Sequence, residues 1–448
     1  MSPDDVLAAC EHAGVRLVRF LYCDNGGTIR GKATTLPRLV ERMRTGIGLT
    51  VAMSAMNSLD QLQSVPGLGP VGEVRLVPDP ETLKILPYAP RSAAMLCDQI
   101  GLDGAPDPVG PRHFLRRMVA QLEGEGLCLR AAVENEFALA WPAADASFGP
   151  VDESLCFSTV GMAAASEVTV ALVDALAAQG IELEQYYPEL GWGQHELSVA
   201  PRPLLAAADT QILVRETIRG VAGGHGLAAS LAPKPWPEAA GNGAHIHFSA
   251  WEGERNAFFD PNGRFGVSEL AEHFVAGVLA HAPALLALTA PSVNSYRRLQ
   301  PRSWSSAYVC WGPDNREATV RVPSTFWGAE EASTNLEYKP ADASANPYLA
   351  FGALVAAGVD GLRQKLEPPA PLSDDPADLS EVERQAAGAA RYPQTLGDAL
   401  DALEADPVLL DALGEPLARA YLAVRRSEVV AYAAQDDDFE FRHHFLKY

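Results

Sequence analysis

The sequence predicts a mixed α+β protein with a small sheet domain first and a larger domain after it. At 448 residues the chain is too long for one small core and suits about two domains. Strand and helix patterns mix along its larger part instead of alternating as regular βαβ units. Residues 103–111 are rich in Gly, Pro and Asp, which favours a boundary. We therefore divide the chain into domains of residues 1–105 and 106–448.

The N-terminal part has the pattern of a hairpin. Residues 14–20 read as a strand, the sequence NGG at 25–27 favours a turn, and a second strand runs toward Lys32. Residues 71–77 alternate between apolar and polar again before a Pro-Asp-Pro sequence ends the pattern. These patterns predict a small mixed sheet.

The larger part begins with an amphipathic helix, which starts at Pro111 and runs to about Glu123. Residues 367–381 are rich in Pro and Asp and predict a surface loop. The predicted strands are 128–141, 195–200, 244–251, 318–323 and 335–339, and the predicted helices are 166–178, 203–222, 268–288, 347–365 and 395–434, the last with a candidate break at Pro407.

Composition and charge exclude several classes of protein. The net charge of −22 disfavours binding to DNA or RNA. The six cysteines are scattered without a CxxC spacing, which argues against a disulfide framework and for a reducing compartment. The longest apolar stretch, residues 274–290, is short for a membrane span and predicts a buried helix. The acidic start lacks a signal-peptide pattern, so we expect a cytoplasmic location and no membrane partner.

Two glutamates lie two residues apart in the apolar segment 131–141, AAVENEFALAW. In a strand, Glu134 and Glu136 point to the same face. Two carboxylates on one buried face are costly unless something compensates their charge, and a hard divalent cation can do so. Taken alone, the pair fits a solvent-exposed strand face better than a metal site.

Two histidines repeat this spacing in the segment 244–251, AHIHFSAW. His245 and His247 share one strand face, and the Gly-Asn-Gly sequence at 241–243 lets the backbone come close to a ligand. One histidine could bind a metal while the other donates to a phosphate. Taken alone, a pair of hydrogen-bonded core histidines explains the pattern equally well.

Further acids and a run of arginines complete the set of candidate residues. Glu189 and Glu196 flank a Gly-Trp-Gly-Gln segment in a loop that turns into a strand, and Glu337 lies within a short apolar strand. Taken alone, a polar loop is the simpler explanation for the first two. Arginines suit forked recognition of carboxylate and phosphate, although surface ion pairs are the alternative. The arginines of the segment 294–323 are Arg297, Arg298, Arg302, Arg316 and Arg321.

Together these segments predict a site for phosphoryl transfer. Glutamates and histidines in several apolar strands suit divalent metals that carry a nucleotide's phosphates, with arginines neutralising charge as the phosphoryl group moves. The sequence has no GxxxxGK[ST] loop and no GxSxG elbow. We therefore do not expect the nucleotide to be bound by such a glycine-rich phosphate-binding loop.

The five segments, in this order, resemble the glutamine synthetase family over most of the chain. The motifs NGxHxH, NSYxRL, WGxxNR…xRVP and the NPYL after a buried glutamate carry the resemblance. It implies an N-terminal β-grasp domain followed by a larger catalytic domain, an antiparallel sheet with helices. It also implies ATP as co-substrate, Mg²⁺ or Mn²⁺, and a double-ring dodecamer with each active site between two subunits. The implied reaction joins the γ-carboxyl of glutamate to an amine nitrogen through a γ-glutamyl phosphate.

The resemblance assigns roles to individual residues. It implies one metal site of Glu136, Glu189 and Glu196 and another of Glu134, His245 and Glu337. It implies that His247, Arg316 and Arg321 face the transferred phosphate, that Ser249 and Arg316 lie near the nucleotide, and that Asn242, Gly243 and Arg298 bind glutamate.

Three positions depart from ammonia-using members of that family. Trp304 stands where they carry a flap glutamate, the segment 51–59, VAMSAMNSL, lacks their ammonium-binding aspartate, and Lys339 replaces an arginine on the substrate side. Asp60 is nearby but has no clear alignment. An ammonium ion needs anionic neighbours, so we expect an organic amine as acceptor, bound partly by Trp304. Such γ-glutamylamide ligases act on polyamines, ethanolamine, methylamine or aromatic amines.

Two alternatives remain open at this point. The chain could be an ordinary ammonia-using glutamine synthetase in which another acid replaces the flap glutamate. It could also be a non-catalytic ring-forming member, whose signature would be the loss of several metal ligands. All six ligand positions carry a suitable side chain here, which disfavours the second alternative.

Overall fold

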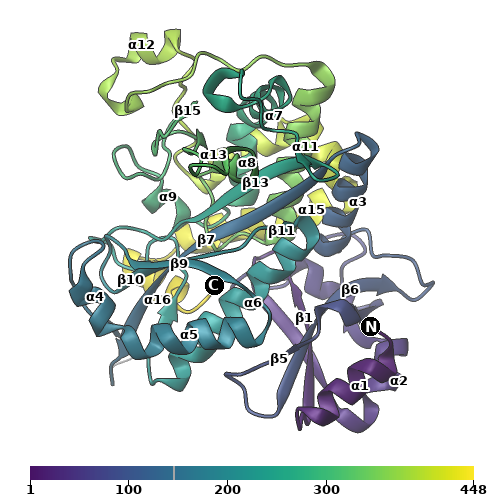
Figure 1. The fold of residues 1–448 in the computed structure, drawn as a ribbon. Helices are drawn as coiled ribbons and strands as arrows, with labels where there is room; N and C mark the ends of the chain where they lie inside the picture. Colours follow the sequence, from purple (N-terminus) through teal and green to yellow (C-terminus); the bar gives the residue numbers. More distant parts are fainter. Residues whose placement is uncertain (145–146) are drawn as a thin grey trace.

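The computed structural model describes residues 1–144 and 147–448, and two sheets organise it (Figure 1). The first sheet has the order β2-β1-β6-β4-β3, with β5 added to β6. β1 and β6 are parallel, whereas β1 and β2 form the predicted antiparallel hairpin around the turn at 24–27. The elements of this part are α1 (Pro3–His12), β1 (Leu17–Cys23), β2 (Ile29–Thr35), α2 (Leu39–Thr45), β3 (Ile47–Thr50), β4 (Glu73–Pro78), β5 (Lys84–Ile85) and β6 (Ser92–Gly101).

The second sheet is larger and has the order β15-β16-β17-β13-β7-β10-β9, with β8, β11 and β12 paired to β7 and β14 paired to β13. Its pairs are antiparallel apart from β15 and β16. The strands are β7 (Cys128–Pro142), β8 (Phe148–Pro150), β9 (Leu183–Pro188), β10 (Gln194–Val199), β11 (Arg202–Pro203), β12 (Ala228–Ser230), β13 (Ala244–Glu252), β14 (Arg255–Asn256), β15 (Trp311–Pro313), β16 (Val320–Val322) and β17 (Leu336–Tyr338).

Helices surround the second sheet and confirm the α+β prediction (Figure 1). α11 is almost entirely buried and packs against α3, α6 and α7. The helices after residue 105 are α3 (Pro111–Gly124), α4 (Thr159–Ala164), α5 (Ser166–Ala178), α6 (Leu204–Gly224), α7 (Glu269–Ala280), α8 (Ala282–Thr289), α9 (Ser295–Arg298), α10 (Glu330–Ser333), α11 (Pro347–Gln364), α12 (Glu381–Ala386), α13 (Leu396–Glu404), α14 (Pro407–Leu413), α15 (Glu415–Ala433) and α16 (Asp437–Phe445).

The two central strands, β7 and β13, have opposite chemistry on their two faces. Leu129 and Val133 of β7 and Ile246 and Phe248 of β13 belong to the main core beneath α6, α7 and α11. Because successive side chains of a strand point to opposite faces, the positions that alternate with these core residues point away from the core. The acids and histidines predicted to carry the chemistry occupy those positions.

The apolar stretch predicted as one helix, residues 268–288, is two helices. α7 and α8 meet at 77° around His281, and Pro283 lies in the first turn of α8. The ring of His281 bonds to Asp406 and Asp360, at 2.6 and 3.2 Å, which fixes the corner. In the described part of the chain no single helix is long and apolar enough to span a membrane, and only this bent pair passes by length and composition together.

The segment 395–434 contains three helices rather than one helix with a candidate break. α13 ends before Asp406, whose side chain caps α14, and Pro407 lies at the start of α14 as predicted. A second break at Gly414, with φ of +81°, separates α14 from α15. Glycine adopts this conformation without steric cost, so Gly414 was the available signal for this second break.

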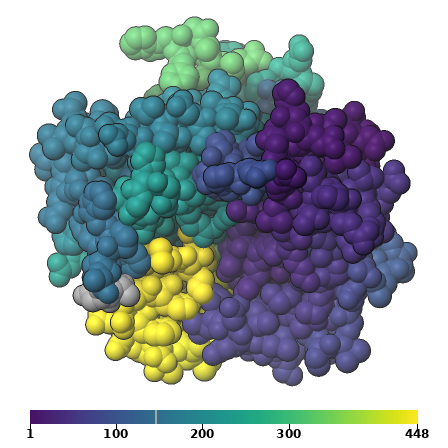
Figure 2. Space-filling view, turned by 90° about the horizontal axis from the view of Figure 1, so that it is seen from below, coloured from purple at the N-terminus to yellow at the C-terminus, as the bar shows by residue number. Residues whose placement is uncertain are grey.

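The C-terminal residues pack against the N-terminal part of the chain, as Figure 2 shows for the yellow and purple segments. Lys447 donates to the carbonyl of Ser58, and the carboxylate of Glu428 in α15 accepts the backbone N–H of the same serine. Asn57 bonds to Ser427 of α15. The segment 51–59 is therefore anchored at Asn57 and Ser58.

A buried arginine joins the two parts of the chain. Arg112, at the start of α3, is 4% exposed and donates to Asp209 of α6 and Asp98 of β6 at 2.8 to 3.0 Å. It also reaches Asp79 at 2.8 Å, and the hydroxyl of Tyr348 donates to Asp209. The guanidinium thus holds three carboxylates from separate elements.

Replacing Arg112 with Met is expected to lower the free energy of unfolding by about 3–5 kcal/mol, because it leaves the buried carboxylate of Asp209 without a cationic partner. The matched control is Arg116→Met, since Arg116 contacts Asp79 and Asp98 but is 40% exposed and should contribute at most about 1 kcal/mol. Urea titration measures both. Equal losses for the two variants would contradict this account.

Candidate active site

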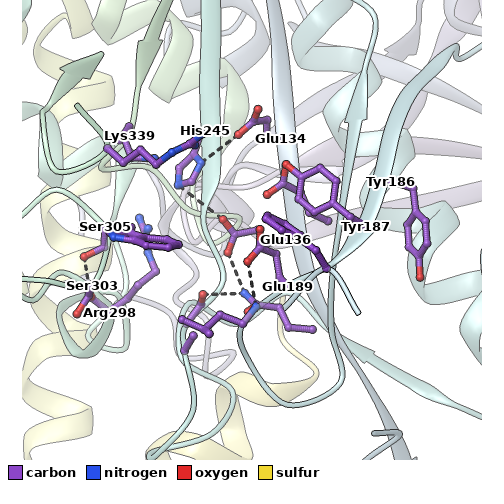
Figure 3. A pocket seen from close by; sticks show the side chains of 18 of the residues that line it. Glu134, Glu136, Tyr186, Tyr187, Glu189, His245, Arg298, Ser303, Ser305 and Lys339 are labelled. Atoms are coloured by element: carbon purple, nitrogen blue, oxygen red, sulfur yellow. Dashed lines mark hydrogen bonds and ion pairs between the residues drawn. The ribbon is translucent and has the colours of Figure 1, made fainter. Parts of the chain in front are cut away.

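Acidic side chains from neighbouring strands meet on one face of the large sheet. Glu196 of β10 lies opposite Glu136 of β7, and His245 of β13 lies opposite Glu134 of β7. Glu189 follows the end of β9, with its backbone N–H bonded to β10. The same-face expectation for Glu134 and Glu136 is confirmed, because both line a cavity of about 530 Å³ together with the other three residues (Figure 3).

His247 links this cavity to a deeper carboxylate. It lies opposite Glu337 of β17, and its Nε2 is 3.1 Å from Glu134 Oε1 and 3.8 Å from Glu337 Oε1. His245 reaches the same two carboxylates through Nδ1, at 3.2 and 3.5 Å. Candidate ligand atoms of Glu134, His247 and Glu337 lie within 4.8 Å of one another. Both histidines are within reach of one ion, so the choice of His245 as the ligand remains a prediction.

The two halves of the cluster differ in their electrostatics. Burial opposes ionisation of Glu337, but Lys339 and His247 outweigh it and lower the pKa of Glu337 to about 2. In the other half, burial and the charge of Glu136 raise the pKa of Glu189 to about 7. Burial and the charge of Glu134 raise the pKa of Glu196 well above its usual value. The second half therefore lacks compensating positive charge.

This deficit fits a divalent cation. Among the described residues, no lysine or arginine forms an ion pair with Glu136, Glu189 or Glu196. Their nearest side-chain partners are Gln194, Cys156 and the hydroxyl of Tyr187. Carboxylate oxygens on one concave face are the ligands that Mg²⁺ and Mn²⁺ prefer. The residues present thus suit the predicted metals.

Cationic side chains form the opposite wall of the cavity. Arg298 is 5% exposed, its Nη2 donates to the carbonyl of Ala341 at 2.8 Å, and its Nε has no partner within the described residues. Burial lowers the pKa of this guanidinium. A buried guanidinium with unused donors suits a substrate carboxylate. Arg316 and Lys339 also line the cavity, whereas Arg321 lies behind it and donates to Glu337 at 2.7 Å.

Three residues with predicted substrate or nucleotide contacts lie outside the cavity lining. Asn242 turns its amide to the carbonyls of Ser230 and Ala232, so it holds the loop before β13. Gly243 donates its N–H to Glu136 at 2.9 Å, and a Cβ there would lie 2.6 Å from His245 Nε2, so a larger residue would displace the ring of His245. Ser249 is buried further along β13 and accepts a bond from Trp251. Their predicted roles remain predictions.

Gln194 is a site residue to which the sequence analysis gave no role. Its Nε2 lies 2.8 Å from Glu136 Oε2, 2.8 Å from the carbonyl of Gly241 and 3.0 Å from Asn242 Oδ1, while its Oε1 accepts the N–H of Gly191. It thereby orients a predicted metal ligand and the glycine-rich loop together. Its place between Glu189 and Glu196 in the sequence was the available signal.

Replacing Gln194 with Leu is expected to weaken Mn²⁺ binding about 10- to 100-fold, because partners that orient a metal ligand matter nearly as much as the ligand. Titration calorimetry with Mn²⁺ on the purified protein measures it. The matched control is Gln179→Leu, which removes a buried amide that bonds to Ala175 and Thr217 away from the cavity. An equal loss of affinity in both variants would contradict the role of Gln194.

Trp304 lies at the mouth of the cavity, where apolar side chains gather. Trp304, Phe157 and Leu190 all line the cavity yet are 57%, 59% and 58% exposed. Phe157 also packs edge-on against Tyr187, with ring centroids 5.1 Å apart. Exposed apolar side chains grouped at a cavity mouth favour an apolar partner.

No aspartate takes the place of the missing ammonium-site residue within the described cavity. Asp60 is absent from its lining and pairs with Arg30 at 2.8 Å. Asn57 and Ser58 are buried against α15. Within one chain, therefore, the segment 51–60 contributes no acid to the cavity.

Comparison with known proteins identifies the class that this fold and cavity define. A family model described as "Glutamine synthetase, catalytic domain" matches residues 108–444, and one described as "Glutamine synthetase N-terminal domain" matches residues 3–107. The chain belongs to the glutamine synthetase family of ATP-dependent C–N ligases, whose members use divalent metals. The expected order of an N-terminal and a catalytic domain is confirmed. The division at residue 105 remains a prediction.

Individual relatives are similar over nearly their whole length. A gamma-glutamylpolyamine synthetase, GlnA3, of Streptomyces coelicolor is 39% identical over 95% of this chain and 92% of the relative. A glutamine synthetase of Halobacterium salinarum is 33% identical over 99% of this chain and 96% of the relative.

Solved structures have the same fold. A novel glutamine synthase homolog superposes with a TM-score of 0.86 at 37% identity, covering 97% of this chain and 99% of that chain. A complex of GmaS with ADP superposes with a TM-score of 0.85 at 29% identity, covering 98% of both chains.

Proposed function

We propose that this protein joins the γ-carboxyl of glutamate to an organic amine, with ATP as the source of energy. The observation that carries the choice of acceptor is the apolar mouth around Trp304, at the position where ammonia-using members carry an acid. The higher identity to a gamma-glutamylpolyamine synthetase than to the glutamine synthetase of Halobacterium salinarum supports the same choice.

The cavity suits both halves of this reaction. In the first half, the γ-carboxylate of glutamate attacks the γ-phosphorus of ATP, the bond to ADP breaks, and γ-glutamyl phosphate forms. In the second half, the amine nitrogen attacks the acyl carbon, loses a proton, and phosphate leaves. Metal ions bound by Glu134, Glu136, Glu189, Glu196, Glu337 and His245 or His247 would neutralise charge on phosphate oxygens.

The cationic wall complements these acids. Arg298 and Arg316 both line the cavity, which supports a role for Arg298 in binding the glutamate carboxylate and for Arg316 in facing the transferred phosphoryl group. Arg321 and Lys339 both pair with Glu337, so they keep it ionised beside His247.

Phosphate release tests the acceptor. The purified enzyme with glutamate, ATP and Mg²⁺ is offered ammonium, putrescine, ethanolamine, methylamine and benzylamine, and the γ-glutamyl product is detected by mass. We expect at least one organic amine to exceed ammonium in kcat/KM. A high-affinity response to ammonium alone would select ordinary glutamine synthetase, and no turnover with any acceptor would select the non-catalytic alternative.

Three further expectations belong to this proposal. The family resemblance implies a double-ring dodecamer, which light scattering or sedimentation tests. Mg²⁺ and Mn²⁺ both suit the carboxylate ligands, and titration of the protein with each metal shows which one binds more tightly. The scattered cysteines, which have no CxxC spacing, support a cytoplasmic location, which fractionation of cells tests.

A further inference from the structure

The loop of residues 301–306 carries Trp304 in a conformation that needs external support. Arg302, Trp304 and Ser306 have φ values of 58°, 51° and 68°, in the left-handed region that residues with a side chain rarely adopt. Three residues with positive φ within five positions are not stable through the backbone preferences of the residues themselves. Contacts outside the loop must therefore keep Trp304 at the cavity mouth.

The strongest of these contacts comes from a buried carboxylate, Glu317. Its Oε1 accepts the backbone N–H of Trp304 at 2.6 Å, and the residue is only 5% exposed. Its Oε2 has no hydrogen-bond partner among the described residues. Glu317 does not line the cavity, so it reaches the mouth only through the loop.

Glu317 is itself fixed from behind. Its N–H donates to Asn315 Oδ1 at 3.0 Å, and the amide of Asn315 donates to the carbonyls of Leu372 and Asp374 at 2.9 and 3.0 Å. The carboxylate is thus a rigid base for the loop and not a surface group that follows it.

The remaining contacts of the loop are weaker or lie at its end. Arg302 pairs with Asp378 at 2.6 Å, but both side chains are about two-thirds exposed, so water competes for the pair. Ser305 bonds to the carbonyl of Arg298 at 2.9 Å, which ties the end of the loop to the predicted glutamate site. In the middle of the loop, the buried contact is the one to Glu317.

We infer that Glu317 is a positioning residue for the acceptor amine: its carboxylate holds the backbone of Trp304 and so sets the shape of the apolar mouth. The inference rests on the proposed function. It predicts that Glu317 acts on the second half of the reaction through the loop and leaves the phosphoryl half unchanged.

Two acceptors distinguish an effect on the phosphoryl half of the reaction from an effect on the amine half. Hydroxylamine is small and traps γ-glutamyl phosphate without needing the apolar mouth, whereas the best organic amine of the screen uses it. Glu317→Ala is expected to raise KM for that amine about tenfold, the effect of one lost charge-assisted hydrogen bond, with hydroxamate formation changed less than about twofold. Glu317→Gln keeps an accepting oxygen and should restore part of the loss.

The control variant is Arg302→Ala, which removes the exposed pair of the same loop and should leave KM within about twofold. A double-mutant cycle with Trp304→Ala adds a readout that a general loss of stability would not give. If Glu317 acts through Trp304, then Glu317→Ala costs little more once the indole is gone.

Either of two results would overturn the role of Glu317 but leave the proposed function standing. One is that Glu317→Ala impairs the reaction with hydroxylamine as much as the reaction with the amine. The other is that the effects of Glu317→Ala and Trp304→Ala on KM for the amine multiply in the double variant. Absence of hydroxamate from the unaltered enzyme would instead overturn the proposed function together with this inference. Glu317→Gln decides the question if Glu317→Ala does not fold.

Discussion

Replacing Glu196 with Gln is expected to have opposite effects on the stability and the activity of the enzyme. Glu196 is 3% exposed and lies opposite Glu136, and burial and the charge of Glu134 raise its pKa. Removing one charge from this cluster relieves repulsion, so the metal-free protein should melt a few degrees higher. Removing a proposed metal ligand should lower kcat/KM on the order of a thousandfold.

The matched control for this prediction is Glu184→Gln. Glu184 lies on β9, the neighbouring strand, but is exposed and absent from the cavity lining. This variant loses the same charge, so its melting temperature and activity should stay close to those of the unaltered enzyme. Scanning calorimetry with and without Mn²⁺, beside phosphate release, measures both effects. A lower melting temperature of metal-free Glu196→Gln would contradict the like-charge account.

Replacing Arg298 with Lys is expected to raise KM for glutamate about a hundredfold, because lysine cannot form two parallel hydrogen bonds to a carboxylate. The buried guanidinium donates to the carbonyl of Ala341, and its Nε has no partner in the part of the chain that the structure describes, so its remaining donors are available to a ligand. KM for ATP should change little. Initial rates with glutamate and ATP varied separately distinguish the two constants.

Arg297→Lys is the control for that variant. Arg297 is the preceding residue of α9, but it is 41% exposed and pairs with Asp437 and Glu440 outside the cavity. It should leave KM for glutamate within about twofold. Equal effects at both positions would remove Arg298 from the glutamate site.

Local pattern predicted much of the site, because the period of a strand alone decides which side chains share a face. The spacing of Glu134 with Glu136 and of His245 with His247 was enough to place each pair on one side of β7 and β13. The register that sets Glu196 opposite Glu136 could not be read from spacing. It depends on pairing between segments about 60 residues apart, which local propensity does not specify.

The residues that sequence reasoning missed act over long distances in the chain. Gln194 reaches Gly241 and Asn242, 47 and 48 residues further along the chain, and Glu317 reaches back to Trp304, 13 residues before it. A glutamine or glutamate of this kind has no distinctive neighbours in the sequence. The break at Gly414 was missed for a different reason, since the helical pattern of residues 395–434 continues across it.

Strand β7 carries Glu134 and Glu136 and is paired with β8, β10, β11, β12 and β13, so a deletion of one residue within it would turn both acids to the opposite face. The apolar mouth, in contrast, comes from Phe157, Leu190 and Trp304, which lie outside the strands. Evolution can therefore exchange the acceptor through a few loop substitutions while the half of the enzyme that activates glutamate is inherited unchanged.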